Sequence, residues 1–202
     1  MCGRFVLMDD SDIAEINKIM TDISAKYKDS GLTAKTGEVY PTNNAAILAL
    51  QNGKPSLSLM QWGFPKWDNK GIIINAKSET AAEKRMFAKP LAEHRCVVPS
   101  TGFFEWAKRD GKTKTKYRFN DKNGLMLYMA GFYTNYNDHE EDKLIKDRFV
   151  ILTRSANDSI SDIHERMPVI LYKHELVHWL TDSDFASFVL RRNDVELIRE
   201  AV

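Results

Sequence analysis

Short runs of β-branched, aromatic and other apolar residues recur along most of the chain, and they constrain the fold more than any other feature of the sequence. Turn-forming dipeptides separate several of these runs, as β-hairpins require. The dipeptides are Asn52-Gly53, Asp110-Gly111 and Asn123-Gly124. We expect strands at residues 4–8, 45–50, 57–62, 71–75, 96–99, 103–106, 115–119, 125–132, 148–153 and 169–172.

Helical periodicity is confined to a few segments. Isoleucines at helical spacing predict an amphipathic helix that follows the N-cap candidates at residues 9–12 and ends before Gly31. Further helices are expected at residues 79–87, 173–180 and 183–192. Strands and helices do not alternate regularly, and 202 residues suit one domain. The sequence therefore predicts a single α+β domain, residues 1–202, with a mostly antiparallel, barrel-like β-sheet core flanked by helices.

The charge of the chain is balanced overall but unevenly distributed. A net charge of +1 excludes indiscriminate binding to polyanions, and 43% hydrophobic residues exclude a disordered chain. Residues 66–118, however, hold 13 basic and 6 acidic side chains, which is a candidate electrostatic footprint for phosphate. Within this segment, lysine occupies every second position at Lys112, Lys114 and Lys116, which places the three side chains on one face of a strand. That face could be solvated, or it could contact a ligand.

No apolar stretch approaches the 18 or so residues of a membrane span, and no secretory leader is recognisable. We expect no membrane association and a cytoplasmic location. Two cysteines, Cys2 and Cys96, are too few for a disulfide framework or a four-cysteine zinc site, so free thiols are expected.

The segment His174-Glu175-Leu176-Val177-His178 matches the HExxH pattern of zinc metallopeptidases. On a helix its two histidines would share one face, and Glu175 could activate a zinc-bound water. The alternative is an amphipathic surface helix with Leu176, Val177 and Leu180 packed inward. Only 24 residues follow His178 to complete an active site, which favours the surface helix and leaves no metal or other cofactor expected.

Cys2 becomes the N-terminal residue once Met1 is removed, and small residues at position two permit that removal. Its α-amine and thiol would then form a 1,2-aminothiol, with ordinary pKa values near 8 and 8.5. Such a group condenses with an aldehyde through an imine, which the thiol traps as a thiazolidine ring. The alternative is that Cys2 is a small apolar residue that opens a strand.

Three polar residues lie in or beside apolar stretches. Asn75 follows three isoleucines, Glu105 lies among aromatic residues, and His164 lies in an expected loop before the last strand. Each alone suits a satisfied polar side chain. With Cys2 they offer a nucleophile, an amide, a carboxylate and an imidazole, which form a usable active site if the fold brings them together.

Several motifs in order and at matching spacing resemble the SRAP family, the SOS response-associated peptidases, whose members form DNA–protein crosslinks at abasic sites. The resemblance spans about residues 1–180. It rests on residues 1–5 (MCGRF), 62–64 (WGF), 75–80 (NAKSET), 85–87 (RMF), 95–106 (RC to GFFEW), Thr153, and 164–168 (HERMP).

This resemblance implies catalytic roles for four residues. Cys2 would capture the deoxyribose aldehyde, Asn75 would position the N-terminal residue, and Glu105 would handle protons at the amine and sugar. His164 would act as a general acid/base in ring opening. The peptidase label implies at least removal of Met1, so the chain is expected to be an enzyme of the hydrolase or lyase class.

The implied partner is single-stranded DNA with abasic sites, or a single-strand/double-strand junction, and the protein would be nucleoid-associated when bound to DNA. The DNA would be gripped by Arg4, Trp67, Lys77 and Arg85. Family members often carry Arg where this chain has Lys77, so a point charge replaces a two-pronged phosphate contact. Residues 194–198 resemble a shortened C-terminal tail.

A noncatalytic single-stranded DNA-binding module that uses the basic segment is a further alternative. A monomer is expected, since the sequence shows no heptad repeat.

Overall fold

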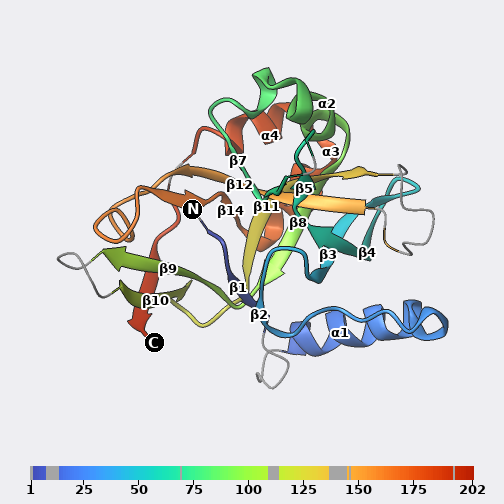
Figure 1. The fold of residues 1–202 in the computed structure, drawn as a ribbon, viewed down its shortest axis with the longest axis horizontal. Helices are drawn as coiled ribbons and strands as arrows, with labels where there is room; N and C mark the ends of the chain where they lie inside the picture. The colour runs from blue at the N-terminus through green and yellow to red at the C-terminus, as the bar shows by residue number, and fades with distance from the viewer. Residues whose placement is uncertain are drawn as a thin grey trace.

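A computed structural model describes residues 2–7, 14–68, 70–108, 114–136, 145, 147–192 and 194–202. Within them two larger β-sheets and four α-helices form an α+β fold (Figure 1). This confirms the predicted fold class. The N-cap candidates at residues 9–12 and the Asp110-Gly111 turn lie outside the described residues.

The core of the molecule is an eight-stranded sheet in which five strands pair in a closed ring. The ring runs β12, β4, β3, β8, β11 and back to β12, so these strands leave no free edge between them. The five strands are β3 (Asn44–Gln51), β4 (Lys54–Trp62), β8 (Arg95–Ser100), β11 (Leu127–Asn135) and β12 (Asp147–Ser155). Closure gives the predicted barrel-like core a physical basis.

Three short strands extend this sheet, and a separate pair lies beside it. They are β7 (Asn75–Lys77), β13 (Arg166–Pro168) and β14 (Ile170–Leu171), and the separate pair is β5 (Phe64–Pro65) with β6 (Ile72–Ile73). The expected strand at residues 71–75 is thus two strands interrupted at Ile74. The β12 strand pairs in parallel with both β4 and β7, whereas the other pairings are antiparallel.

A five-stranded antiparallel sheet carries the N-terminal strand between β9 and β2. Its members are β1 (Phe5–Leu7), β2 (Gly37–Val39), β9 (Gly102–Lys108), β10 (Lys114–Asp121) and β15 (Leu197–Ala201). The segment interpreted from sequence as a shortened tail leads into β15, which pairs with β10 as an edge strand (Figure 1).

The turns were predicted with mixed success. Asn52 and Gly53 both have positive φ, 51° and 75°, and join β3 to β4 in a tight hairpin, as predicted. Asn123-Gly124 does not close a hairpin, because β10 and β11 belong to different sheets. That turn instead carries the chain from one sheet to the other, and a local sequence signal cannot distinguish these two uses.

Helix α1 (Ala14–Lys26) buries Ile16, Ile19 and Ile23, and Gly31 at φ 67° follows the short 3₁₀ turn after it. Figure 1 shows α2 (Arg85–Glu93), α3 (Leu176–Thr181) and α4 (Ser183–Val189) grouped away from α1. The expected helix at 79–87 is wrong in its bounds. A 3₁₀ turn spans Ala81–Glu83. The backbone of Lys84 is extended (ψ 121°) and interrupts the helical conformation, so α2 begins only at Arg85.

The expected helix at 173–180 is likewise a 3₁₀ turn (Lys173–Glu175) followed by α3, and the one at 183–192 ends at Val189. Asp182 caps α4 by accepting hydrogen bonds from two backbone amides, those of Asp184 and Phe185.

Two apolar clusters pack on the sheets. The first holds the buried faces of the helices together with Val97 and Phe132. The second lies between the barrel strands and the five-stranded sheet, and contains Cys2, Phe5 and Trp62. The second cluster therefore fixes the N-terminus against the barrel.

Candidate functional site

Cys2 lies at the entry to β1 and is fully buried in the second apolar cluster. Pairing of β1 with β9 and β2 holds this end of the chain in place. Asn75, the first residue of β7, donates a hydrogen bond from Nδ2 to the Cys2 carbonyl oxygen at 2.9 Å. Because β7 is paired with β12, the amide that contacts Cys2 is mounted on the barrel.

Glu105 and His164 face one another beside Cys2. The Glu105 side chain on β9 is 5% exposed, and its Oε2 lies 4.0 Å from Nε2 of His164. Burial raises the pKa of Glu105, and the nearby His164 opposes the increase. The backbone amide of Arg166 donates to His164 Nδ1 at 2.9 Å, and the Arg166 carbonyl oxygen lies 3.2 Å from the same nitrogen, so Arg166 holds the ring with Nε2 toward Glu105.

The Cys2 thiol has a strongly raised pKa because of its burial, and the Glu105 carboxylate raises it further. Cys96 is also a free, fully buried thiol with a raised pKa, but it lies on β8 within the apolar core. The structure therefore brings Cys2, Asn75, Glu105 and His164 into one connected cluster, whereas Cys96 belongs to the packing of the barrel.

Arg4 is the most tightly held of the four expected DNA contacts. Its guanidinium carbon lies 4.3 Å from the centre of the Tyr40 ring and 4.9 Å from that of Trp106, and its Nη1 contacts Glu38 at 3.1 Å. Lys77 is exposed at the end of β7, on the strand that carries Asn75. Trp67 is 91% exposed, and Arg85 is exposed at the start of α2.

Glu38 is a site residue that the sequence did not reveal. It accepts hydrogen bonds from Arg4, Lys116 and the Tyr40 hydroxyl, and these partners hold its pKa below its usual range despite burial. Lys116 also lies 3.9 Å from the centre of the Phe104 ring, so it is an internal ion-pair partner and not a purely solvated strand face. An isolated acidic residue in a short strand gives no sequence signal for such a role.

Arg166 anchors the strand that follows His164. Its two terminal nitrogens contact the two carboxylate oxygens of Glu79 at 2.6 and 2.7 Å, and one of them also donates to the Thr153 carbonyl. This pairing ties β13 to the segment after β7 and thereby helps to place the residues that precede β13. The motifs contained both residues, but only the fold shows that they pair.

The HExxH segment does not assemble a metal site in the part of the chain that the structure describes. Glu175 is buried and forms an ion pair with Arg192, and its Oε2 also accepts from the Tyr172 amide. No group of three or more candidate metal ligands occurs among the described residues. The predicted inward packing is partly wrong: Leu180 is buried and Leu176 is half-buried, as expected, whereas Val177 is 54% exposed, and the inward-facing residue not predicted is Trp179.

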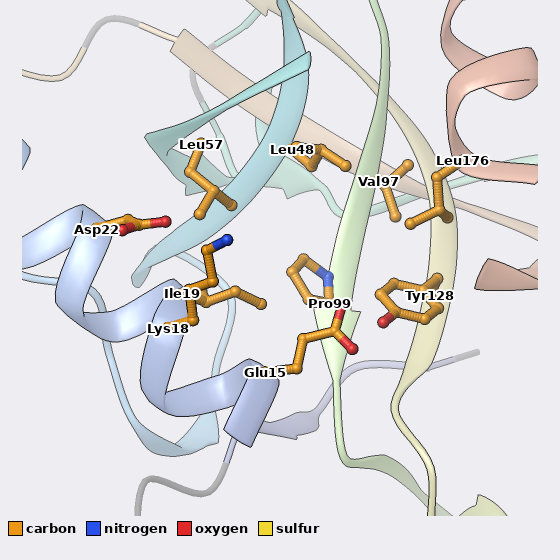
Figure 2. Close-up of a pocket in the computed structure, with 10 residues that line it drawn as sticks. All are labelled: Glu15, Lys18, Ile19, Asp22, Leu48, Leu57, Val97, Pro99, Tyr128 and Leu176. Carbon is orange, nitrogen blue, oxygen red and sulfur yellow. The ribbon is translucent and has the colours of Figure 1, made fainter. Parts of the chain in front are cut away.

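A mostly apolar cavity of about 200 Å³ lies elsewhere, between α1 and the sheet (Figure 2). Figure 2 shows the Tyr128 hydroxyl pointing toward the Glu15 carboxylate at one end of it. Its buried apolar lining, including Ile19 and Val97, belongs to the first cluster. None of the eight expected site residues lines this cavity.

No helix among the described residues is long and apolar enough to cross a bilayer. What distinguishes the molecule is an α+β fold in which a closed barrel and a second sheet hold the second residue beside an amide and a carboxylate, with an imidazole next to that carboxylate. This defines a protein with a candidate functional site around its second residue.

The chain belongs to the SRAP family, because the family model described as "SOS response associated peptidase (SRAP)" matches residues 1–196. It is 34% identical over 211 residues to the abasic site processing protein YoqW of Bacillus subtilis, covering 97% of this chain and 89% of that one. YoaM of the same organism, also an abasic site processing protein, is 33% identical, with 97% and 88% covered.

A crystal structure of a protein from Bacteroides thetaiotaomicron superposes with a TM-score of 0.78 at 26% identity, over 100% of this chain and 92% of that one. One from Bordetella bronchiseptica, with a TM-score of 0.74 and 24% identity, shows the same fold.

Proposed function

We propose that this protein processes abasic sites in DNA, and that it captures the lesion in single-stranded DNA through a covalent thiazolidine bond to Cys2. The observation that carries the proposal is the Asn75 hydrogen bond to the Cys2 carbonyl, because it holds the N-terminal residue in place where its thiol is close enough to Glu105 to feel the carboxylate charge. The names of the relatives YoqW and YoaM support abasic DNA as the substrate.

The raised pKa of the Cys2 thiol indicates the order of the chemical steps. A thiol that stays protonated at neutral pH is a weak nucleophile, so the α-amine, free once Met1 is removed, attacks the deoxyribose aldehyde first. Loss of water gives an imine. The thiol then adds its sulfur to the imine carbon while its proton passes to the nitrogen, which closes the five-membered ring.

Glu105 and His164 supply the proton transfers. A carboxyl group whose pKa is raised by burial can accept a proton from the attacking amine and return it to the departing hydroxyl. His164, with its Nε2 toward Glu105, promotes opening of the closed sugar to the reactive aldehyde. Asn75 keeps the Cys2 backbone in position during both steps.

The DNA grip is proposed to consist of Arg4, Lys77, Arg85 and Trp67. Exposed Lys77 and Arg85 and half-buried Arg4 would neutralise phosphates, and the 91% exposed Trp67 is free to stack on a base. Such contacts do not depend on the base sequence of the DNA, and they weaken as the salt concentration rises. The protein is then expected to work as a monomer in the cytoplasm, at the nucleoid when bound to DNA, and self-processing would remove Met1.

The test is the intact mass of the protein before and after incubation with single-stranded DNA containing one abasic site. The expected product is Met1-free protein plus DNA minus one water, stable in denaturant. Cys2→Ala and Cys2→Ser both keep the α-amine but lack the thiol, so each should lose this stable adduct and leave only an imine that borohydride traps. Cys96→Ala is the matched thiol control and should crosslink normally. Undiminished stable adduct with Cys2→Ala would refute the mechanism.

A further inference from the structure

A groove of about 510 Å³, lined by both polar and apolar side chains, lies where the parallel strands β7 and β12 end. Ser78 and Glu79 follow β7, Arg154 and Ser155 end β12, and Ser187 and Arg191 approach from α4 and the residues after it. We call this the serine–arginine groove. Carboxyl ends of neighbouring parallel strands are a common place for ligands, because the strand ends diverge into loops there.

The charge of the groove is positive. Arg154 and Arg191 line it, and its carboxylate, Glu79, has both oxygens bonded to Arg166 just outside. Three guanidinium groups therefore surround one carboxylate. The charges of Arg192 and Asp194 also act on Arg154. These two residues form an ion pair with each other at 2.8 Å, so their opposite charges largely cancel at Arg154.

Two donors at the groove lack acceptors among the described residues. The Ser78 hydroxyl is buried without a hydrogen-bond partner, in a residue only 7% exposed. Nε of Arg154 is likewise buried without one, while its Nη1 makes a long contact of 3.4 Å to the Val189 carbonyl. Buried donors are normally satisfied, and a phosphate group, with several acceptor oxygens and negative charge, meets the needs of both.

The groove and the candidate active site lie at opposite ends of β7. Asn75 at the start of that strand contacts Cys2, and Ser78 lies three residues further, about 10 Å along an extended chain. Exposed Lys77 lies between them. About 10 Å corresponds to roughly three nucleotides at the rise of a strand in duplex DNA, and to fewer in an extended single strand.

We propose that the serine–arginine groove binds one backbone phosphate of the DNA strand, a few nucleotides from the abasic nucleotide held at Cys2. This rests on the proposed function. Arg154 and Ser78 are the phosphate-binding residues, and Glu79 is a positioning residue that is neutralised by Arg166. The groove would set how the strand leaves the active site.

The test measures reversible binding of single-stranded oligonucleotides that carry a tetrahydrofuran abasic analogue, which has no aldehyde and cannot crosslink. One phosphate at a time is replaced by a neutral methylphosphonate. Arg154→Gln should weaken binding of the fully charged strand about tenfold. At one position in the strand, the methylphosphonate replacement should weaken binding to the wild type by a similar factor. The same replacement should not weaken binding to Arg154→Gln any further.

Arg148→Gln, on the same strand but at its other end, is the matched control and should shift binding little at this linkage. Ser78→Ala provides a milder variant, and thermal unfolding checks that each protein is folded. The proposal would be overturned if Arg154→Gln and Arg148→Gln weakened binding equally. It would also be overturned if every methylphosphonate replacement weakened binding to Arg154→Gln as much as it weakens binding to the wild type.

The source of the phosphate is tested separately. Inorganic phosphate could raise the melting temperature of the wild type but not of Arg154→Gln, while no single methylphosphonate replacement changes binding. In that case the groove binds free phosphate, and the proposal that it binds DNA is wrong. If the linkage effect is present but an aldehyde-bearing strand gives no adduct, the groove stands and the Cys2 chemistry fails.

Discussion

The Glu79–Arg166 pair allows a quantitative prediction about stability and pH. Arg166 is 8% exposed and Glu79 contacts both of its terminal nitrogens, which lowers the pKa of Glu79 from 4.5 to about 2. A pKa lowered from 4.5 to about 2 corresponds to about 3.4 kcal/mol at most. The Glu79 side chain is 45% exposed, so solvent screening reduces the expected contribution to about 1–2 kcal/mol.

The sign follows from proton linkage. Glu79 has the lower pKa in the folded protein, so the unfolded chain binds more protons in acid and stability falls as pH falls. The contribution is fully present above about pH 4.5 and is lost between there and about pH 2. Glu79→Gln should therefore lose about 1–2 kcal/mol at pH 7, and progressively less relative to wild type below pH 4.5.

Urea unfolding followed by fluorescence of the buried tryptophans, Trp62 and Trp179, measures this difference at a series of pH values from 7 to 3. Glu93→Gln is the control, since its 3.9 Å contact to Lys89 is an exposed helical pair worth at most about 0.5 kcal/mol. The reasoning would be refuted by a Glu79→Gln penalty that equals the control, or by one that stays constant with pH.

Three further outcomes are expected. Gly102→Ala should destabilise the protein by about 1–3 kcal/mol in the same unfolding assay, because a β-carbon there would lie 2.4 Å from Asn120 Oδ1 and 2.8 Å from a backbone carbonyl; unchanged stability would contradict this. His178→Ala and chelator treatment should leave adduct formation intact, whereas a loss reversed by zinc would revive the metal hypothesis. Glu38→Gln should release Arg4 from its ion pair, which should slow adduct formation and steepen the salt dependence of DNA binding. Equal rates of adduct formation in Glu38→Gln and the wild type would show that Arg4 does not need Glu38 to hold it.

The sequence indicated the members of the candidate site better than their supports. Cys2 was singled out by its position, and Asn75, Glu105 and His164 by motifs that stand out in a linear reading. Their contacts join residues as far as 73 positions apart, which periodicity cannot predict. Glu38 was missed for the same reason, because its partners lie just before β1 and on β10 and its own strand is only three residues long.

Local chemistry explains which elements were predicted well. The alternation of apolar residues, and the Asn52-Gly53 turn with its two positive φ angles, act within a few residues, so the sequence alone determined most strands, α1 and the β3–β4 hairpin. The 79–87 helix was misplaced because Lys84, an ordinary helix former, is extended where the chain turns from the 3₁₀ segment into α2.

Closure of the barrel and the choice of sheet for each strand were decided only in three dimensions. Asn123-Gly124 has the same local chemistry as Asn52-Gly53, yet it separates strands of different sheets, because β10 pairs with β9 and β15 whereas β11 pairs with β8 and β12. Burial of Cys2, the pKa changes at Cys2 and Glu105, and the positive groove beyond β7 follow from that pairing. The sequence alone determined which groups were available for chemistry, and long-range packing decided which of them meet.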